Sequence, residues 1–258
     1  MAANHLFKVA LGVWAVLLAA CVPCLAGDAV LFNTGEWPPY TSESLPRGGF
    51  MTEIVASVCA EAGIEPRFEF LPWPRAEAGV SSGTAFAGFP YAQTPVRAES
   101  FDFSEPLFYG VSAALVREDN ERLRPFMAEG LSYAEMKGLA CGALTGSVQA
   151  SLLEDGGVPV KQAPRTEQLL DMLRIGRLDC VVDDQAVLLH FVHNQPQGQE
   201  LRLVAVKEFK KRPVGLIVSR KYPGAQTLLE WFNGAMRRMR ASGEYEAMAV
   251  RFGLDADP

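Results

Sequence analysis

Apolar positions in the first part of the chain recur with two alternating spacings. Residues 50–62 carry apolar side chains three and four positions apart, and Gly63 follows, so this segment is predicted to be a helix that ends there. Pro74 is suited to the first turn of a second helix, which Gly83 ends. Short apolar runs around these helices predict strands at residues 29–33, 67–71 and 85–89. This alternation is typical of a parallel sheet with helices on its faces.

A second series of strands and helices begins near a polar segment at residues 117–130. Strands are predicted at 111–116, 139–144, 158–161, 180–183 and 214–219. Helices are predicted at 147–154, 185–193, 223–240 and 244–252. One more helix is expected to begin with Thr166 as its cap. Because the pattern restarts within the chain, the sequence predicts an α/β protein of two lobes.

The first 26 residues have the pattern of a secretory signal peptide. Lys8 gives a basic start, and residues 9–22 form an apolar run that is too short to span a membrane. Small residues before Asp28 predict cleavage after Ala26. An alternative stays open, because residues 18–21 (LAAC) are similar to a bacterial lipobox in which Cys21 would be lipidated. Both alternatives predict export, with a periplasmic location.

Composition and charge narrow the classes of partner. The chain is 49% hydrophobic and 21% charged, as in ordinary globular proteins. Without the leader and its single Lys8, 24 − 1 = 23 basic and 30 acidic residues remain, a net charge of −7. The basic residues form only one short run, at 207–212. An acidic chain without a basic patch is not expected to bind nucleic acid.

Cysteines and histidines give no sign of a metal site. After cleavage, Cys59, Cys141 and Cys180 remain, so at least one thiol must be free. Cys141 and Cys180 lie in two apolar strands, and both a disulfide between them and a pair of buried thiols stay open. His190 and His193 share a helix face, but no third ligand accompanies them. We therefore expect no metal and no cofactor.

Five segments occur in an order and spacing that resemble one protein family. They are residues 35–40 (GEWPPY), 47–50 (RGGF), 94–107 (TPVRAESFDFSEPL), 176–184 (GRLDCVVDD) and 239–245 (MRASGEY). Together they are similar to the periplasmic solute-binding proteins of polar amino-acid ABC transporters, bacterial extracellular solute-binding protein family 3. The resemblance covers nearly all of residues 28–254.

The resemblance implies a two-lobed periplasmic-binding-protein-like fold of type II, with two crossing strands as its hinge. Lobe 1 would comprise residues 28–112 and 212–258, and lobe 2 residues 113–211. The protein would be a monomeric receptor without catalytic residues. It would clamp a small polar solute, such as an amino acid or a related carboxylate, and deliver it to a membrane permease. Two alternatives stay open: a periplasmic sensor protein, and a relative of the cyclohexadienyl or arogenate dehydratases.

The resemblance also assigns roles to individual residues. Arg97 of the Thr-x-x-Arg segment would grip a ligand carboxylate, which the planar guanidinium matches with two parallel bonds. Asp184 would accept the ligand ammonium group. Further ligand contacts are implied for Trp37, Tyr40, Ser147, Val148 and Gln149. In competing interpretations, Arg97 pairs with Glu99 or Asp102, and Asp183 or Asp184 caps a helix.

The chain departs from the family pattern in one segment. Residues 89–92 (FPYA) contain none of the hydroxyl residues that amino-acid binders carry there, and Tyr91 or Gln93 is expected to take their place. Trp73 and Arg75 lie at the start of a predicted helix, where two alternatives stay open: they reach the mouth of the cleft, or they simply cover the lobe. These differences bear on the identity of the ligand more than on the clamp.

Overall fold

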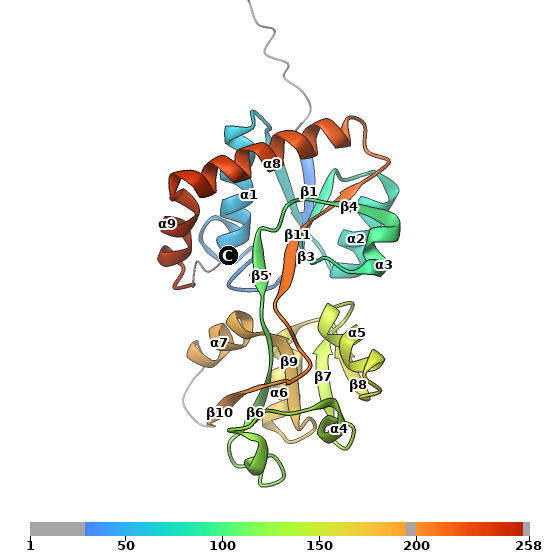
Figure 1. Cartoon of the computed structure of the whole chain (residues 1–258), viewed down its shortest axis with the longest axis vertical. Coiled ribbons are helices and arrows are strands. Elements are labelled where there is room, and N and C mark those ends of the chain that lie inside the picture. Colours follow the sequence, from blue (N-terminus) through green and yellow to red (C-terminus); the bar gives the residue numbers. More distant parts are fainter. Residues whose placement is uncertain (1–28, 195–199, 255–258) are drawn as a thin grey trace, which may run out of the picture.

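The computed structural model describes residues 29–194 and 200–254, which form two lobes, each built on its own β-sheet (Figure 1). We call them lobe 1, with β1–β5, β11, α1–α3, α8 and α9, and lobe 2, with β6–β10 and α4–α7. The predicted signal peptide, residues 1–26, and the alternative lipidation site, Cys21, lie outside the described residues.

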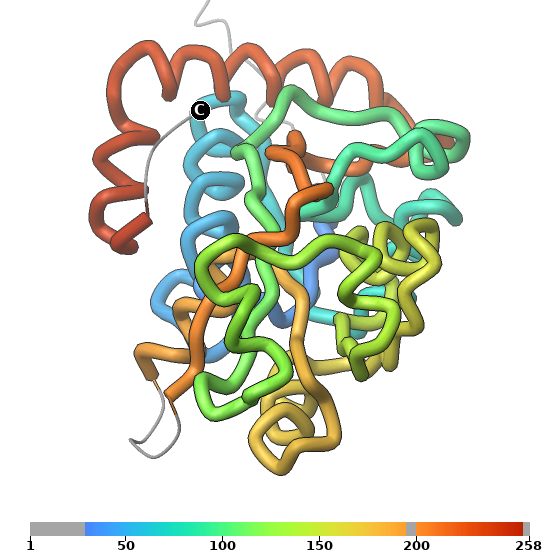
Figure 2. The backbone as a smooth tube through the Cα atoms, turned by 60° about the horizontal axis from the view of Figure 1, so that its bottom comes forward, coloured from blue at the N-terminus to red at the C-terminus, as the bar shows by residue number. Residues whose placement is uncertain are grey.

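Lobe 1 contains a mixed sheet in the order β2-β1-β3-β11-β4, and β5 also pairs with β11. Its strands are β1 (Val30–Thr34), β2 (Pro66–Phe70), β3 (Ala87–Ala92), β4 (Phe101–Phe103), β5 (Phe108–Gly110) and β11 (Arg212–Ser219). Its helices are η1 (Pro46–Gly48), α1 (Phe50–Glu61), α2 (Trp73–Ser82), α3 (Pro95–Ser100), α8 (Ala225–Ser242) and α9 (Glu244–Arg251). Figure 2 shows α8 along the outer side of this lobe, with α9 turning back from its end.

Lobe 2 contains a five-stranded sheet in the order β10-β6-β9-β7-β8. Its strands are β6 (Ser112–Arg117), β7 (Cys141–Leu144), β8 (Val160–Ala163), β9 (Cys180–Asp184) and β10 (Leu201–Ala205). Its helices are η2 (Arg124–Phe126), α4 (Tyr133–Met136), α5 (Val148–Asp155), α6 (Thr166–Arg174) and α7 (Gln185–His193). β9 runs parallel to β7 and antiparallel to β6.

The chain crosses between the lobes twice, and the two crossings lie side by side (Figure 1). The first connects β5 directly to β6 through Val111, and the second connects β10 to β11. The strands on each side of the crossings pair antiparallel, β5 with β11 in lobe 1 and β6 with β10 in lobe 2. This arrangement confirms the predicted fold class, a type II fold with two crossing strands.

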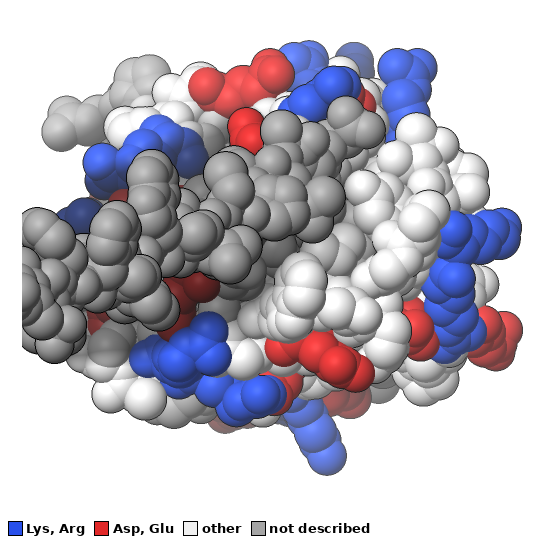
Figure 3. Space-filling view, turned by 90° about the horizontal axis from the view of Figure 1, so that it is seen from above, with Lys and Arg blue, Asp and Glu red and all other residues white. Residues whose placement is uncertain are grey.

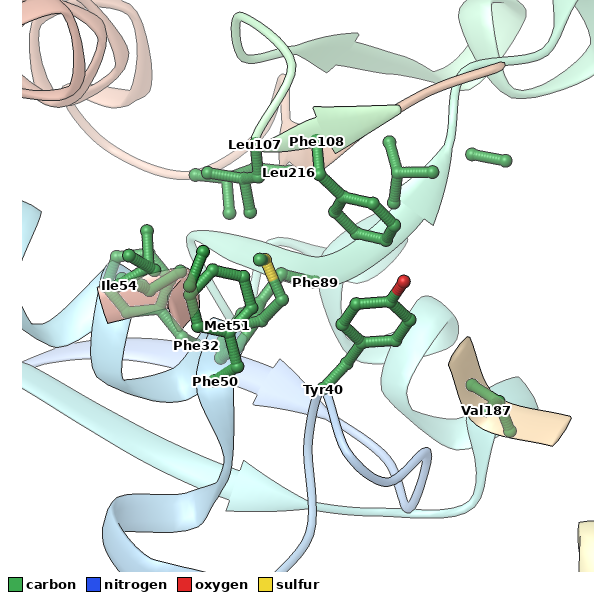
Figure 4. Close-up of a cluster of buried hydrophobic side chains, with 14 of the residues drawn as sticks. Phe32, Tyr40, Phe50, Met51, Ile54, Phe89, Leu107, Phe108, Val187 and Leu216 are labelled. Carbon is green, nitrogen blue, oxygen red and sulfur yellow. The ribbon is translucent and has the colours of Figure 1, made fainter. Parts of the chain in front are cut away.

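Aromatic rings fill the core of lobe 1. The ring of Phe32 in β1 is fully buried and lies 5.3 Å from Phe86 and 6.3 Å from Phe89, both in edge-to-face geometry. Tyr40 and Phe108 lie beside this cluster, and the Tyr40 hydroxyl points out of it (Figure 4). The core of lobe 1 therefore holds the ring of Tyr40, while the hydroxyl of Tyr40 points away from this core.

Gly49 ties the loop after β1 to the start of α1. Its φ angle is 92°, a region that favours glycine, and a Cβ there would lie 2.7 Å from the carbonyl oxygen of Tyr40. The same oxygen accepts a hydrogen bond from the amide of Met51 at 2.8 Å. The loop that carries Trp37 and Tyr40 is thus held at the edge of lobe 1 that faces lobe 2.

Most predicted elements are present, with differences at their ends and in the short ones. α7 has the predicted bounds, whereas β3 begins two residues later than expected. Thr166 is the first residue of α6 rather than its cap, which is Arg165. The elements that were not predicted from the sequence include α3 and β10, and β10 gains its order from pairing with β6.

The surface carries both basic and acidic side chains. Figure 3, which looks onto the outer face of lobe 1, shows basic and acidic groups near one another towards the rim of the view, with uncharged surface between them. Arg237 and Arg238 of α8, for example, pair with Glu105 and Glu61. In the part of the chain that the structure describes, no helix combines the length and the apolar character needed to cross a membrane.

All three described cysteines are buried free thiols. Cys141 of β7 and Cys180 of β9 are directly opposite each other on neighbouring strands, and their sulfur atoms lie 3.1 Å apart. Cys59 lies in α1, in the other lobe. Of the three possible disulfides, only the one between Cys141 and Cys180 is therefore available within the folded chain.

We expect Cys141 and Cys180 to form a disulfide when the folded protein is incubated with oxidised glutathione, which is reduced as the bond forms. After unfolding without reductant, residues 27–258 should then titrate one thiol, that of Cys59. Cys59→Ser should titrate none, and Cys141→Ser should titrate two. Three thiols in the oxidised wild-type protein would contradict this pairing.

Candidate functional site

A cavity of about 60 Å³ lies between the lobes, beside the two crossings. A wider groove of about 740 Å³ adjoins this cavity. Eight of the nine residues predicted to contact ligand line the inner cavity. They are Trp37, Trp73, Tyr91, Arg97, Ser147, Val148, Gln149 and Asp184. Tyr40, the ninth, is hydrogen-bonded to Asp184. The structure therefore brings together residues that are spread over more than half of the sequence.

Arg97 reaches the cavity from the short helix α3. Thr94 caps this helix by accepting the Arg97 amide at 3.2 Å, and Pro95 starts it. The Arg97 guanidinium donates to the carbonyl oxygens of Ala92, at 3.2 Å, and of Gly146 in lobe 2, at 3.1 Å. Its side chain is only 13% exposed. Most of its hydrogen-bond partners are thus neutral, and its charge faces the cavity.

The ion pairs of the competing interpretation of Arg97 do not form in the structure. Its carboxylate partner is Glu77, 3.5 Å away, rather than Glu99 or Asp102. Asp102 pairs instead with Arg220 at 2.9 Å. An ion pair with a part-exposed carboxylate contributes little net stabilisation. Arg97 is therefore available for a second, better-aligned anion.

The segment at residues 89–92, which contains no serine, contributes an aromatic wall through Tyr91. Tyr91 of β3 is buried, and its ring lies 4.8 Å from the Arg97 guanidinium carbon and 5.5 Å from the ring of Trp73. The Tyr91 hydroxyl donates to the carbonyl oxygen of Trp73 at 3.3 Å. Gln93 is not among the residues that line the cavity, and its amide donates to the carbonyl oxygen of Ser104. The Tyr91 ring therefore contributes a face to the site, as a cation–π partner of Arg97.

Two adjacent carboxylates lie at the end of β9, on the lobe 2 side. Asp184 accepts the Tyr40 hydroxyl at 2.9 Å, the Val111 amide at 3.1 Å and the Ala186 amide at 3.0 Å. The bond from Ala186 makes Asp184 the N-cap of α7, as one of the competing interpretations held. The carboxylate is 3% exposed and lies at the crossing, next to Gly110, where a Cβ would approach its Oδ2 to 3.0 Å.

Asp183 is the more deeply buried of the two. It accepts the Trp37 indole N–H at 3.0 Å and the Asp184 amide at 2.7 Å on one oxygen, and the Thr166 hydroxyl at 3.3 Å on the other. Burial raises the pKa of Asp183 to about 6, and its hydrogen bonds act against this rise. Burial likewise raises the pKa of Asp184 to about 7. Both carboxylates therefore titrate near neutral pH.

Trp37 and Tyr40 connect lobe 1 to these carboxylates. Their ring centroids are 4.8 Å apart, and the Tyr40 ring stacks on Phe108 at 4.5 Å. Each ring packs on lobe 1, and each polar end donates to an aspartate of lobe 2. Trp37 thus lines the cleft, and both side chains form hydrogen bonds between the lobes.

The start of α5 forms the lobe 2 floor of the cavity. Ser147 caps this helix by accepting the Ala150 amide at 3.1 Å. The Gln149 side chain is 4% exposed and donates to the hydroxyl of Ser112 at 3.0 Å. Val148 adds an apolar surface between them. Unpaired backbone N–H groups at a helix start favour an anion there.

Arg212 is a charged residue of the cavity that was not predicted from the sequence. It is the first residue of β11, at the second crossing, and it lines both the inner cavity and the outer groove. In the sequence it appears only as the last residue of the short basic run at 207–212. Among the described residues, no group of three or more metal-binding side chains occurs.

Comparisons with known proteins identify the family. The model of the bacterial extracellular solute-binding proteins, family 3, matches residues 31–255. The chain belongs to this family. The cavity of this chain lies between its two lobes.

Individual relatives are distant in sequence. A probable histidine-binding protein of Neisseria gonorrhoeae is 23% identical over 207 residues, which is 79% of this chain and 74% of that protein. An ancestral arginine-binding protein bound to arginine is 25% identical with a TM-score of 0.74, over 87% of this chain and 97% of that one. The GluR0 ligand-binding core from Nostoc punctiforme in complex with (L)-glutamate is 23% identical with a TM-score of 0.73, over 86% and 98%. These likenesses agree with the type II fold.

We expect Tyr40→Phe to loosen the contact between the lobes. The change keeps the ring but removes a donor from buried Asp184, which costs about 1–3 kcal/mol. The radius of gyration measured by small-angle X-ray scattering, without added ligand, should exceed that of the wild type. Tyr109→Phe, at a side chain that is exposed on β5, should leave it unchanged. An equal radius for Tyr40→Phe and the wild type would contradict a role of this bond in closure.

Thermal unfolding should depend on pH through Asp184. Its folded-state pKa of about 7 lies above the value of about 4 for an unfolded aspartate, so the folded protein binds more protons between these values. The contribution of Asp184 to the free energy of unfolding therefore falls as the pH rises from about 4 to about 7. The Tm of Asp184→Asn relative to wild type should increase over this range, and that of Asp155→Asn, at an exposed site, should not. Parallel curves for all three proteins would contradict this assignment.

Proposed function

We propose that the protein is a periplasmic receptor that clamps a small polar solute, an amino acid or a related carboxylate, for an ABC transporter. The observation that carries this proposal is the cavity between the lobes, where Arg97 of lobe 1 faces Asp184 and the start of α5 in lobe 2. A carboxylate next to Arg97 and an ammonium group next to Asp184 would each gain a charged partner. The roles of the nine predicted contact residues are part of this proposal.

Closure around the ligand follows from the position of these groups. Residues 28–112 with 212–258 would move as one unit and residues 113–211 as the other, about the two crossings. A ligand that contacts both units only in the closed form shifts the population towards it. The membrane permease would then recognise the closed form, and the receptor would act as a monomer.

Three further observations support an amino acid as the ligand. The relatives include proteins named for histidine, glutamate and L-cystine binding. Solved structures of similar fold hold arginine, glutamine or glutamate. The lining of the cavity contains a guanidinium, that of Arg97, and a carboxylate, that of Asp184, which match the charges of an α-carboxylate and an α-ammonium group. Export would use the leader at residues 1–26 or, in the alternative, lipidation of Cys21.

Two alternative functions use the same cleft. A periplasmic sensor would present the closed form to a receptor kinase instead of a permease, with identical binding chemistry. A dehydratase would need an acid free to protonate a leaving hydroxyl. Asp183 and Asp184 have raised pKa values, but both already accept hydrogen bonds on each oxygen. Membership of a solute-binding family also favours the receptor over the enzyme.

The test is a thermal-shift screen of residues 27–258, unfolded and refolded to remove bound solute, against the amino acids and small dicarboxylates. A ligand at 100 times its Kd should stabilise the fold by about 2.7 kcal/mol. Arg97→Met should weaken the strongest ligand about 100-fold, as expected when a charged partner is lost. Arg75→Met is the control, because Arg75 is exposed and lies outside the lining of the cavity.

The outcomes separate the site from the function. A ligand that binds equally well to Arg97→Met keeps the receptor and contradicts the carboxylate clamp. Turnover of prephenate or arogenate to an aromatic product would establish the dehydratase instead. The absence of any ligand among amino acids and dicarboxylates would contradict the proposed function.

A further inference from the structure

The charges of the inner cavity do not balance around a simple amino acid. Only three of its lining residues are charged: Arg97, Asp184 and Arg212. The carboxylate and ammonium of an amino acid would pair with Arg97 and Asp184. The guanidinium of Arg212 would then have no counterpart inside the cavity.

Among the described residues Arg212 has no ion-pair partner, and its charge only opposes the rise in the pKa of Tyr133 that burial causes. The Nε of Arg212 lies buried without a hydrogen bond, and within the described residues no carboxylate forms an ion pair with its side chain. Asp155 also lines the outer groove, but it is not within ion-pair distance of Arg212. A buried donor without an acceptor is costly, and a guanidinium always carries its charge. An acceptor from the ligand would remove this cost.

The other two charged groups of the cavity, and the buried amide of Gln149, already have partners. Asp184 accepts three hydrogen bonds from the protein, and the Gln149 amide donates to Ser112. Arg97 donates to two carbonyl oxygens. Arg212 is therefore the charged group of this cavity whose bonding capacity is least used, and it lies where the inner cavity meets the wider groove.

We infer that Arg212 determines specificity by binding a second anionic group of the ligand, so that the preferred ligand is a dicarboxylic amino acid. This inference rests on the proposed function. The α-carboxylate would pair with Arg97, and the side-chain carboxylate would extend along the crossing strand towards Arg212. A site built around a charged donor rejects a ligand that leaves this donor unpaired. A neutral amide in place of the second carboxylate would pair less strongly with the Arg212 guanidinium.

The experiment compares ligands that differ only in this group. Isothermal titration of refolded residues 27–258 with L-glutamate and L-glutamine, and with L-aspartate and L-asparagine, gives two acid-to-amide affinity ratios. In the wild type we expect at least one acid to bind about tenfold or more tightly than its amide. Arg212→Met should reduce that ratio to about one while the amide still binds. Lys210→Met, an equal change of charge at an exposed position two residues away, should preserve the ratio.

Each remaining outcome overturns the inference in a recognisable way. A wild type that binds an amide or another amino acid as tightly as the acids contradicts this role of Arg212 but leaves the receptor intact. A ratio that survives in Arg212→Met contradicts it as well. If Arg212→Met does not fold, Arg212→Lys takes its place. This variant keeps the charge and should keep a preference for the acid. Loss of that preference in Arg212→Lys would contradict the inference. Binding of a small dicarboxylate but of no amino acid would contradict the inference and leave the receptor, whereas binding of neither would overturn the proposed function as well.

Discussion

Two buried carboxylates in lobe 2 accept hydrogen bonds from two aromatic side chains of lobe 1, and the contact between the lobes depends on these bonds. Asp183 and Asp184 are almost without exposure, so each needs donors to offset the loss of water. Trp37 and Tyr40 supply donors from across the cleft. Separation of the lobes would remove these donors and admit water at the same time. Closure and the protonation of the two carboxylates are therefore linked.

The rest of the site is arranged around this contact. The Trp37–Tyr40 pair packs on Phe108 of β5. The first crossing, this aromatic pair and the two carboxylates therefore form one continuous set of contacts. The Val111 amide, within the crossing itself, also donates to Asp184. Arg97 adds a second connection through the Gly146 carbonyl. A solute between the lobes would thus act on a structure in which hinge and binding groups already touch.

The sequence predicted the elements whose signals are local. The segment 185–193 has an apolar helical pattern directly after Asp184, which caps it, and α7 has these bounds. β10 has no such signal, because its order depends on pairing with β6, which is distant in sequence. Arg97 was predicted from a motif whose local structure, a capped turn of helix, points the side chain to the cleft. Arg212 was missed, because its neighbours in sequence are exposed lysines and only the crossing of the strands turns it inwards.

The hydrogen bond of Trp37 has an optical consequence. An indole bonded to a buried carboxylate emits light in an environment unlike that of an indole in water, so the fluorescence of Trp37 would change as the lobes separate. Trp73 lines the same cavity, whereas Trp231 of α8 is 54% exposed on the outer side of lobe 1 and would emit alike in both states. The protein thus contains an intrinsic probe of its own closure, together with an internal reference.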